Sequence, residues 1–155
     1  MIKRAMFPGS FDPITRGHEN IIRRALPIFD EIVIAVGVNI EKKGYFPIDD
    51  RIKWISDVFA GEPKIKVLSY SGLTVDFCKK ISADFLLRGL RTSADFEFER
   101  TVGQVNKKLN PDIETVFLLS NPEFTSINSS IVRDVYKNGG DVSAFIPDAV
   151  VLPEV

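Results

Sequence analysis

The stretch 31–38, EIVIAVGV, constrains the fold more than any other part of this sequence. It is a nearly continuous run of apolar residues, several of them β-branched. A strand with this pattern is buried on both faces, which is typical of a parallel sheet covered by helices. We therefore expect an α/β protein in which strands alternate with helical crossovers.

The rest of the chain repeats this alternation of short apolar runs and longer amphipathic stretches. Strands are predicted at residues 2–7, 31–38, 64–70, 84–88 and 113–119, and helices at 17–29, 49–60, 73–81, 93–109 and 128–137. This pattern predicts a single doubly wound, Rossmann-like domain over residues 1–155, with a five-stranded parallel sheet and helices on both faces. Residues 141–155 are expected to be a peripheral C-terminal segment. Ligands of such sheets bind outside the carboxyl ends of the strands, where the strand order reverses.

Composition narrows the function classes. A net charge of −1 and a pI near 5.9 give no bulk attraction to nucleic acid or to an anionic membrane. A single cysteine excludes an internal disulfide framework and favours the cytoplasm, and a single histidine argues against a multi-histidine metal site. The sequence shows neither a signal-peptide pattern nor an uncharged run of membrane-spanning length.

The loop after the first predicted strand, 7–18, reads FPGSFDPITRGH and carries the clearest chemical signal. Gly9 allows close approach of the backbone to a ligand, and Ser10 offers a hydroxyl group. Gly17 and His18 open a helix, whose N-terminus favours anions. The loop is neither a GxGxxG fingerprint nor a Walker A motif, so the dehydrogenase and P-loop ATPase classes are disfavoured.

Basic and hydroxyl residues follow three other predicted strands. Lys42 and Lys43 follow the second, and Arg88 and Arg91 flank Gly89 at the end of the fourth. A cluster of hydroxyl and amide residues at 124–130, FTSINSS, follows the fifth and precedes a helix. Arginine forks, lysines and helix N-termini are suited to binding phosphate groups, so we expect a phosphate-handling site at this edge of the sheet.

These motifs resemble those of a known family. PGSFDPITRGH is similar to the N-terminal signature of the nucleotidylyltransferases with an (H/T)xGH motif, and Thr15 at its first variable position resembles the phosphopantetheine adenylyltransferase family. RGLR followed by ADFEFE, at 88–91 and 94–99, fits the same family. The serine-rich start of the last predicted helix fits this family as well, although Asn128 stands where the family has a serine. The resemblance extends from Ile2 to about Pro147.

The resemblance implies specific roles. It makes His18, Lys42 and Arg91 catalytic, and it makes Ser10, Lys42, Thr74 and Arg88 acceptor-binding residues. For ATP binding it implies Ser10, Phe11, His18, Gly89, Leu90, Arg91, Glu99, Phe124, Thr125, Ser126, Ile127, Asn128, Ser129 and Ser130. Thr74 departs from the larger apolar residue that the family usually has, which leaves the detail of the acceptor pocket open.

The implied reaction transfers the adenylyl group of ATP to 4′-phosphopantetheine, giving 3′-dephospho-coenzyme A and pyrophosphate in coenzyme A biosynthesis. Mg²⁺ is expected to arrive with ATP, without a cage of protein ligands. The resemblance further implies a homo-hexamer and feedback binding of coenzyme A. Neither nucleic acid nor membrane is an expected partner.

Two other functions remain open from the sequence. One is an adenylyl- or cytidylyltransferase on the same fold that acts on a mononucleotide or glycerol phosphate, and Thr15 and the RGLR motif argue against it. The other is a non-catalytic nucleotide-binding module, against which the presence of His18, Lys42 and Arg91 argues.

Three further features receive structural interpretations. Cys78 and Trp54 are expected to pack in the interior, and the acidic pair at 49–50 is expected to stabilise the N-terminus of a helix.

Overall fold

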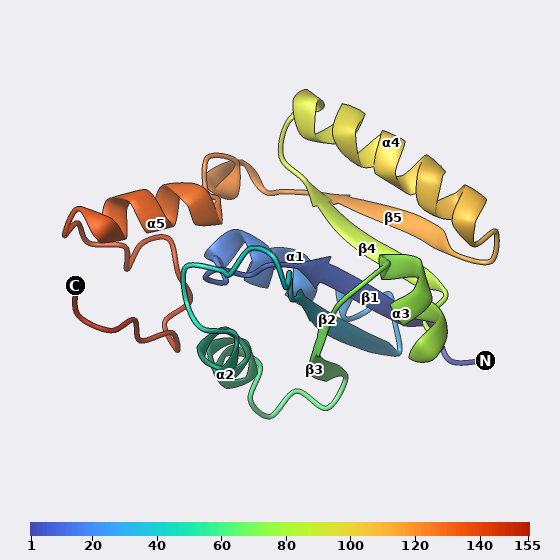
Figure 1. Cartoon of the computed structure of the whole chain (residues 1–155), viewed down its shortest axis with the longest axis horizontal. Coiled ribbons are helices and arrows are strands. Elements are labelled where there is room, and N and C mark those ends of the chain that lie inside the picture. The colour runs from blue at the N-terminus through green and yellow to red at the C-terminus, as the bar shows by residue number, and fades with distance from the viewer.

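The computed structural model describes all 155 residues, and strands alternate with helices along most of the chain (Figure 1). The elements in chain order are β1 (Arg4–Gly9), α1 (Arg16–Ala25), β2 (Glu31–Gly37), α2 (Ile48–Val58), β3 (Ile65–Tyr70), α3 (Thr74–Lys80), β4 (Phe85–Leu90), α4 (Ser93–Leu109), β5 (Glu114–Leu119), the 3-10 helix η1 (Pro122–Phe124) and α5 (Ser129–Lys137). All the predicted strands and helices are confirmed, with ends that differ by a few residues. No helix is both long and apolar enough to cross a membrane.

The strands form one parallel sheet in the order β3-β2-β1-β4-β5. The chain first builds outward from β1 to β3 and then returns to the other side of β1 to add β4 and β5. Right-handed crossovers place α1 and α2 on one face of such a sheet and α3 and α4 on the other. The predicted doubly wound fold is confirmed, and its topological switch point lies between β1 and β4.

The two faces of the sheet are covered unequally. A core cluster of 22 buried residues includes Ile22 of α1, Ile55 of α2 and Val132 of α5, whereas a cluster of 7 includes Val75 and Cys78 of α3. Trp54 and Cys78 are buried, as expected for packing residues. Burial raises the pKa of the Cys78 thiol to about 12, so this thiol is unreactive at neutral pH.

Helix α4 runs alongside β4 and β5 (Figure 1) and is mostly uncovered. Glu99 is its only buried residue. Phe98, Val102, Val105 and Leu109 are exposed and follow one another at spacings of three and four residues, so they form an apolar stripe. We call these four residues the α4 stripe.

The C-terminal segment 141–155 contains no helix or strand, but it is not confined to the periphery of the molecule. Val142, Ile146 and Val150 are buried in the larger core cluster. The backbone N–H of Arg16 donates to the carbonyl of Phe145 at 2.9 Å. The sequence favours a peripheral segment here because the stretch is short and mixed in composition. They nevertheless close the core beside α5.

Candidate active site

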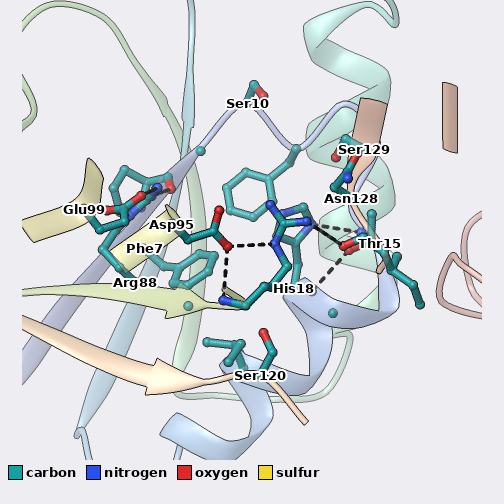
Figure 2. A pocket seen from close by; sticks show the side chains of 18 residues that line it. Phe7, Ser10, Thr15, His18, Arg88, Asp95, Glu99, Ser120, Asn128 and Ser129 are labelled. Atoms are coloured by element: carbon teal, nitrogen blue, oxygen red, sulfur yellow. Dashed lines mark hydrogen bonds and ion pairs between the residues drawn. The ribbon is translucent and has the colours of Figure 1, made fainter. Parts of the chain in front are cut away.

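A cleft opens where β1 and β4 separate. The register pairs six residues of β1 with β2 but only two with β4, Ala5 with Phe85 and Met6 with Leu86. Beyond that point the two strands diverge toward their carboxyl ends. The resulting cleft has a volume of about 280 Å³ and lies at the switch point, where the fold predicts a ligand (Figure 2).

The cleft brings together residues from four separate segments. Ten of the residues implied by the resemblance line it: Ser10, Phe11, His18, Arg88, Gly89, Arg91, Glu99, Ile127, Asn128 and Ser129. They come from the loop after β1, the start of α1, the end of β4 with α4, and the start of α5.

Phe11 forms the wall of the cleft behind His18. Its backbone φ is +45°, an unfavourable value for a bulky residue, and its side chain is only 2% exposed. The Phe11 ring packs against two other rings, with centroid distances of 5.6 Å to Phe7 and 4.9 Å to the His18 imidazole. A Cβ on Gly9 would lie 3.0 Å from this ring. Glycine at position 9 therefore leaves the room that Phe11 needs.

Thr15 and His18 form a reciprocal cap at the N-terminus of α1. The Thr15 hydroxyl oxygen accepts from the backbone N–H of His18 at 3.3 Å, and His18 Nδ1 accepts from the backbone N–H of Thr15 at 3.0 Å. This arrangement is a capping box in which histidine occupies the position usual for Glu or Gln. The three-residue spacing of Thr15 and His18 thus has a local structural cause.

The cap also determines which ring nitrogen of His18 carries the proton. Because Nδ1 accepts a hydrogen bond, the proton of the neutral ring lies on Nε2. Loss of hydration around the ring, together with the positive charges of Arg88 and Arg91, lowers the pKa of His18 to about 4. At neutral pH His18 is therefore a neutral Nε2–H donor beside two cationic side chains.

Arg88 spans the gap between β1 and β4. Its Nη1 donates to the carbonyl of Pro8, while Nε and Nη2 donate to the two carboxylate oxygens of Glu99 at 3.0 and 2.7 Å. Glu99 is 8% exposed whereas the Arg88 side chain is 30% exposed, so the carboxylate of this bidentate pair is shielded from water and the guanidinium remains accessible. A guanidinium group has five N–H bonds, and two of them remain for an anion. Glu99 thus contacts Arg88 with both oxygens and holds the guanidinium in place.

Arg91 is oriented from the first turn of α4. Asp95 accepts from the Arg91 backbone N–H at 3.1 Å and lies 3.3 Å from Arg91 Nε. Arg91 Nη1 also donates to the carbonyl of Ile127 at 3.4 Å. These contacts join the β4–α4 turn to the segment before α5 and keep a guanidinium at the cleft.

The start of α5 supplies backbone N–H groups more than free hydroxyls. Asn128 is the N-cap, and its side chain accepts from the backbone N–H of Ile131 at 2.9 Å. The Ser129 hydroxyl donates to the carbonyl of Pro13 at 2.8 Å, and the Ser130 hydroxyl accepts from Arg133 at 3.2 Å. Asparagine therefore caps this helix in place of the serine that the family has there.

A second cleft, of about 240 Å³, opens on the α3–α4 side of the same gap. It shares Pro8, Gly9, Arg88 and Glu99 with the first cleft. Its other lining residues are Tyr70, Thr74, Leu86, Phe98, Val102, Gly103, Asn106 and Thr115. The hydroxyls of Tyr70 and Thr74 lie 3.1 Å apart and form one hydrogen bond, and both side chains line this second cleft. The Arg88–Glu99 pair stands between two adjoining clefts.

Several residues implied by the resemblance are not among the lining residues of either cleft. These are Lys42, Leu90, Phe124, Thr125, Ser126 and Ser130. Lys42 is exposed on the loop after β2, whereas Leu90 is 7% exposed and belongs to the interior. Phe124 packs beside Gly17, whose added Cβ would lie 3.7 Å from it.

The cleft also contains residues that the sequence did not single out, including Asp95 and Ser120. Asp95 lies within the quoted ADFEFE motif, and its four-residue spacing from Arg91 is a signal for an ion pair on a helix. Ser120 directly follows β5, where the carboxyl-end rule already placed ligands. No group of three or more His, Cys, Asp and Glu side chains could hold a metal ion.

Comparisons with known proteins give a consistent result. The cytidylyltransferase-like family model matches residues 6–135. Phosphopantetheine adenylyltransferase from Flavobacterium psychrophilum is 55% identical over 149 residues, which cover 96% of this chain and 98% of the relative. The protein of the same name from Leptospira biflexa is 47% identical over 146 residues, 94% of this chain and 91% of the relative.

A solved structure supports the fold. The crystal structure of a Vibrio parahaemolyticus protein described as a nicotinate-nucleotide adenylyltransferase superposes with a TM-score of 0.70 at 22% identity, over 97% of this chain and 96% of that chain. At this level of identity the likeness concerns the fold alone.

Proposed function

Because the chain belongs to the phosphopantetheine adenylyltransferases, within the cytidylyltransferase-like family, we propose how its two clefts transfer the adenylyl group of ATP to 4′-phosphopantetheine. The products are 3′-dephospho-coenzyme A and pyrophosphate, and the step belongs to coenzyme A biosynthesis.

The observation that carries the proposal is the sharing of Arg88 and Glu99 by two clefts. A transfer between two phosphate-bearing substrates requires two binding sites that meet at the reacting phosphates. The first cleft, with His18, Arg91 and the start of α5, suits ATP. The second, with Thr74 on the α3–α4 side, suits the acceptor. Arg88, with two free N–H bonds, is then placed to bind the acceptor phosphate.

The ATP side is assigned by charge and by helix geometry. Arg91 and the backbone N–H groups at the start of α5 would bind the β- and γ-phosphates, since helix N-termini and guanidinium groups favour anions. Ser129 and Ser130 belong to this group through their position on the helix. The other ATP-binding residues in this proposal are Ser10, Phe11, Gly89, Leu90, Glu99, Phe124, Thr125, Ser126, Ile127 and Asn128.

The chemical step needs no general base, because the acceptor phosphate is already an anionic nucleophile. One of its oxygens attacks the α-phosphorus, a new P–O bond forms, and the bond to the bridging α–β oxygen breaks as pyrophosphate leaves. His18 donates from Nε2 to the α-phosphate as charge develops, and Lys42 bridges the two reacting phosphates. Positioning contributes roughly 7–11 kcal/mol in favourable cases, and one preorganised donor roughly 3–4 kcal/mol.

Mg²⁺ would enter with ATP. The carboxylates nearest the phosphates, Asp95 and Glu99, are paired with Arg91 and Arg88, so they are not available as a cage. Oxygen ligands from the triphosphate and from water suit this ion, which usually keeps several waters. When bound, the ion neutralises part of the triphosphate charge.

We further propose a cytoplasmic homo-hexamer that coenzyme A inhibits by feedback binding. The α4 stripe supports an assembly of copies, because a contiguous apolar surface on a helix marks an interface. Sedimentation velocity would check the assembly, and inhibition by added coenzyme A would check the feedback.

Pyrophosphate release is the direct test of the function. The enzyme is incubated with ATP or CTP and with one acceptor at a time: 4′-phosphopantetheine, nicotinamide mononucleotide or glycerol 3-phosphate. We expect release with ATP and 4′-phosphopantetheine only. Turnover of another pair would point to a different transferase, and ATP binding without release on any acceptor would point to a non-catalytic nucleotide-binding module.

A further inference from the structure

Arg51 lies in the first half of α2 and is only 5% exposed. A buried guanidinium is costly unless its charge and its N–H bonds are matched. No sequence motif assigns a role to this residue, and its role follows from the partners that match its charge.

The Arg51 guanidinium reaches the loops that follow both β1 and β2. Its Nη1 donates to the carbonyl of Ser10 at 2.8 Å, and its Nε donates to the carbonyl of Phe46 at 3.0 Å. Its Nε also lies 3.9 Å from an oxygen of Asp12, which is itself 5% exposed. One side chain thus joins the loop that carries Ser10 to the loop that carries Lys42.

Asp12 makes the same connection from the opposite direction. It belongs to the loop after β1, and its carboxylate accepts from the backbone N–H groups of Tyr45 and Phe46 at 2.6 and 2.9 Å. Both charged residues therefore have partners on the segment 44–46. The buried Asp12–Arg51 pair holds this segment by three hydrogen bonds.

Gly44 lies in close contact with the Asp12–Arg51 pair. An added Cβ would lie 2.9 Å from Arg51 Nη2 and 3.0 Å from an oxygen of Asp12. A larger residue at this position would have to move either the loop or the pair. The segment is thus fixed both by hydrogen bonds and by close contact.

We infer that Asp12 and Arg51 are positioning residues that set the separation between Ser10 and Lys42, an inference that rests on the proposed function. Lys42 precedes Gly44 by two residues, and two residues of extended chain span about 7 Å at most. Anchoring Gly44 therefore restricts where the Lys42 ammonium can reach. The anchor leaves the lysine itself exposed, which lets it meet phosphate groups.

A matched control separates this role from a merely stabilising one. Arg4 and Glu31 form another partly buried ion pair, at 2.6 Å, at the amino ends of β1 and β2. Arg4 also donates to the carbonyl of Ile81 at 3.1 Å. Arg4→Met removes this ion pair at the amino ends of the strands, opposite the clefts, while Lys66 remains 3.2 Å from Glu31.

The test compares Arg51→Met, Arg51→Lys and Arg4→Met by steady-state kinetics and thermal unfolding. For Arg51→Met we expect kcat to fall roughly 10–100-fold, because small misplacements of reacting groups have effects of that size, with KM for ATP within about threefold. Arg51→Lys should lower kcat less, because lysine keeps the positive charge beside Asp12, although one ammonium cannot reproduce both arms of the fork. Arg4→Met should lose stability but keep kcat within about twofold. Equal kcat in Arg51→Met and Arg4→Met would overturn the inference.

Gly44→Ala decides the matter if Arg51→Met does not fold, because it keeps both charges and disturbs only the close contact between the loop and the pair. A several-fold lower kcat supports the inference, and a wild-type kcat overturns it.

A readout without turnover keeps this inference separate from the proposed function. A spin label is attached at Lys43→Cys, where the inert Cys78 thiol does not compete. Its spectrum should report a more mobile label when Arg51→Met or Gly44→Ala is added, and no change with Arg4→Met. An unchanged spectrum in both Arg51→Met and Gly44→Ala would overturn the inference, whereas failure of the wild type to release pyrophosphate would overturn the proposed function alone.

Discussion

The loops that follow β1 and β2 leave the sheet side by side, because the two strands are paired from Arg4 to Gly9. They are built in opposite ways. Residues 11–15 are all buried, and the loop ends in the Thr15–His18 cap. Residues 38–45 are all exposed and are held at their far end, at 44–46.

This difference suggests that the two loops have different roles in the proposed reaction. The buried loop fixes the tautomer and orientation of His18, so in the proposed mechanism its Nε2–H donor needs no reorganisation. The exposed loop presents Lys42, a flexible cation that phosphate groups can attract from solvent. In the proposed mechanism the first loop supplies geometry and the second supplies charge.

Replacing the fixed donor should have the largest effect. His18→Ala removes the Nε2–H donor and should lower the single-turnover rate by roughly 10²–10³-fold, the range observed when one preorganised donor is lost. Rapid-quench measurement of product formation checks this, with thermal unfolding to show that α1 remains folded without its cap. A decrease of less than about tenfold would show that His18 does not stabilise the transition state.

Replacing the exposed cation should have a smaller effect, and the chain provides a control beside it. Lys42→Ala should lower kcat/KM for the acceptor by roughly 10–100-fold, because a charged donor to both reacting phosphates is lost. Lys43→Ala should stay within about threefold. Equal effects of the two substitutions in steady-state assays would mean that the loop contributes only general positive charge.

The fold could be predicted almost completely, because its signals are local. The apolar run of β2 and the periodicity of the helices depend on residues close in sequence. Helix α4 was predicted with the bounds that the structure gives it. The C-terminal segment is the exception. Val142, Ile146 and Val150 are buried by long-range packing, and no local sequence pattern predicts such burial.

The site was predictable where motifs carry it and not where tertiary contacts do. His18, Arg88 and Arg91 were found from short patterns, and the structure brings them into one cleft. The roles of Glu99 and Arg51 depend on contacts across 11 and 41 residues of sequence, with Arg88 and with the Ser10 carbonyl. Sequence spacing does not reveal such contacts, because they are set by how β1, β2 and β4 meet.

Titration of His18 by NMR tests the central claim most directly, and the assignment is unambiguous because the chain has one histidine. We predict a pKa near 4 and a neutral ring protonated on Nε2 at pH 7, since desolvation and the two arginines disfavour the charged form and the Thr15 N–H occupies Nδ1. Removing the positive charge of Arg91 should raise this pKa. A midpoint at or above 6.5, or a proton on Nδ1 at pH 7, would contradict the account of His18 as a preorganised neutral donor.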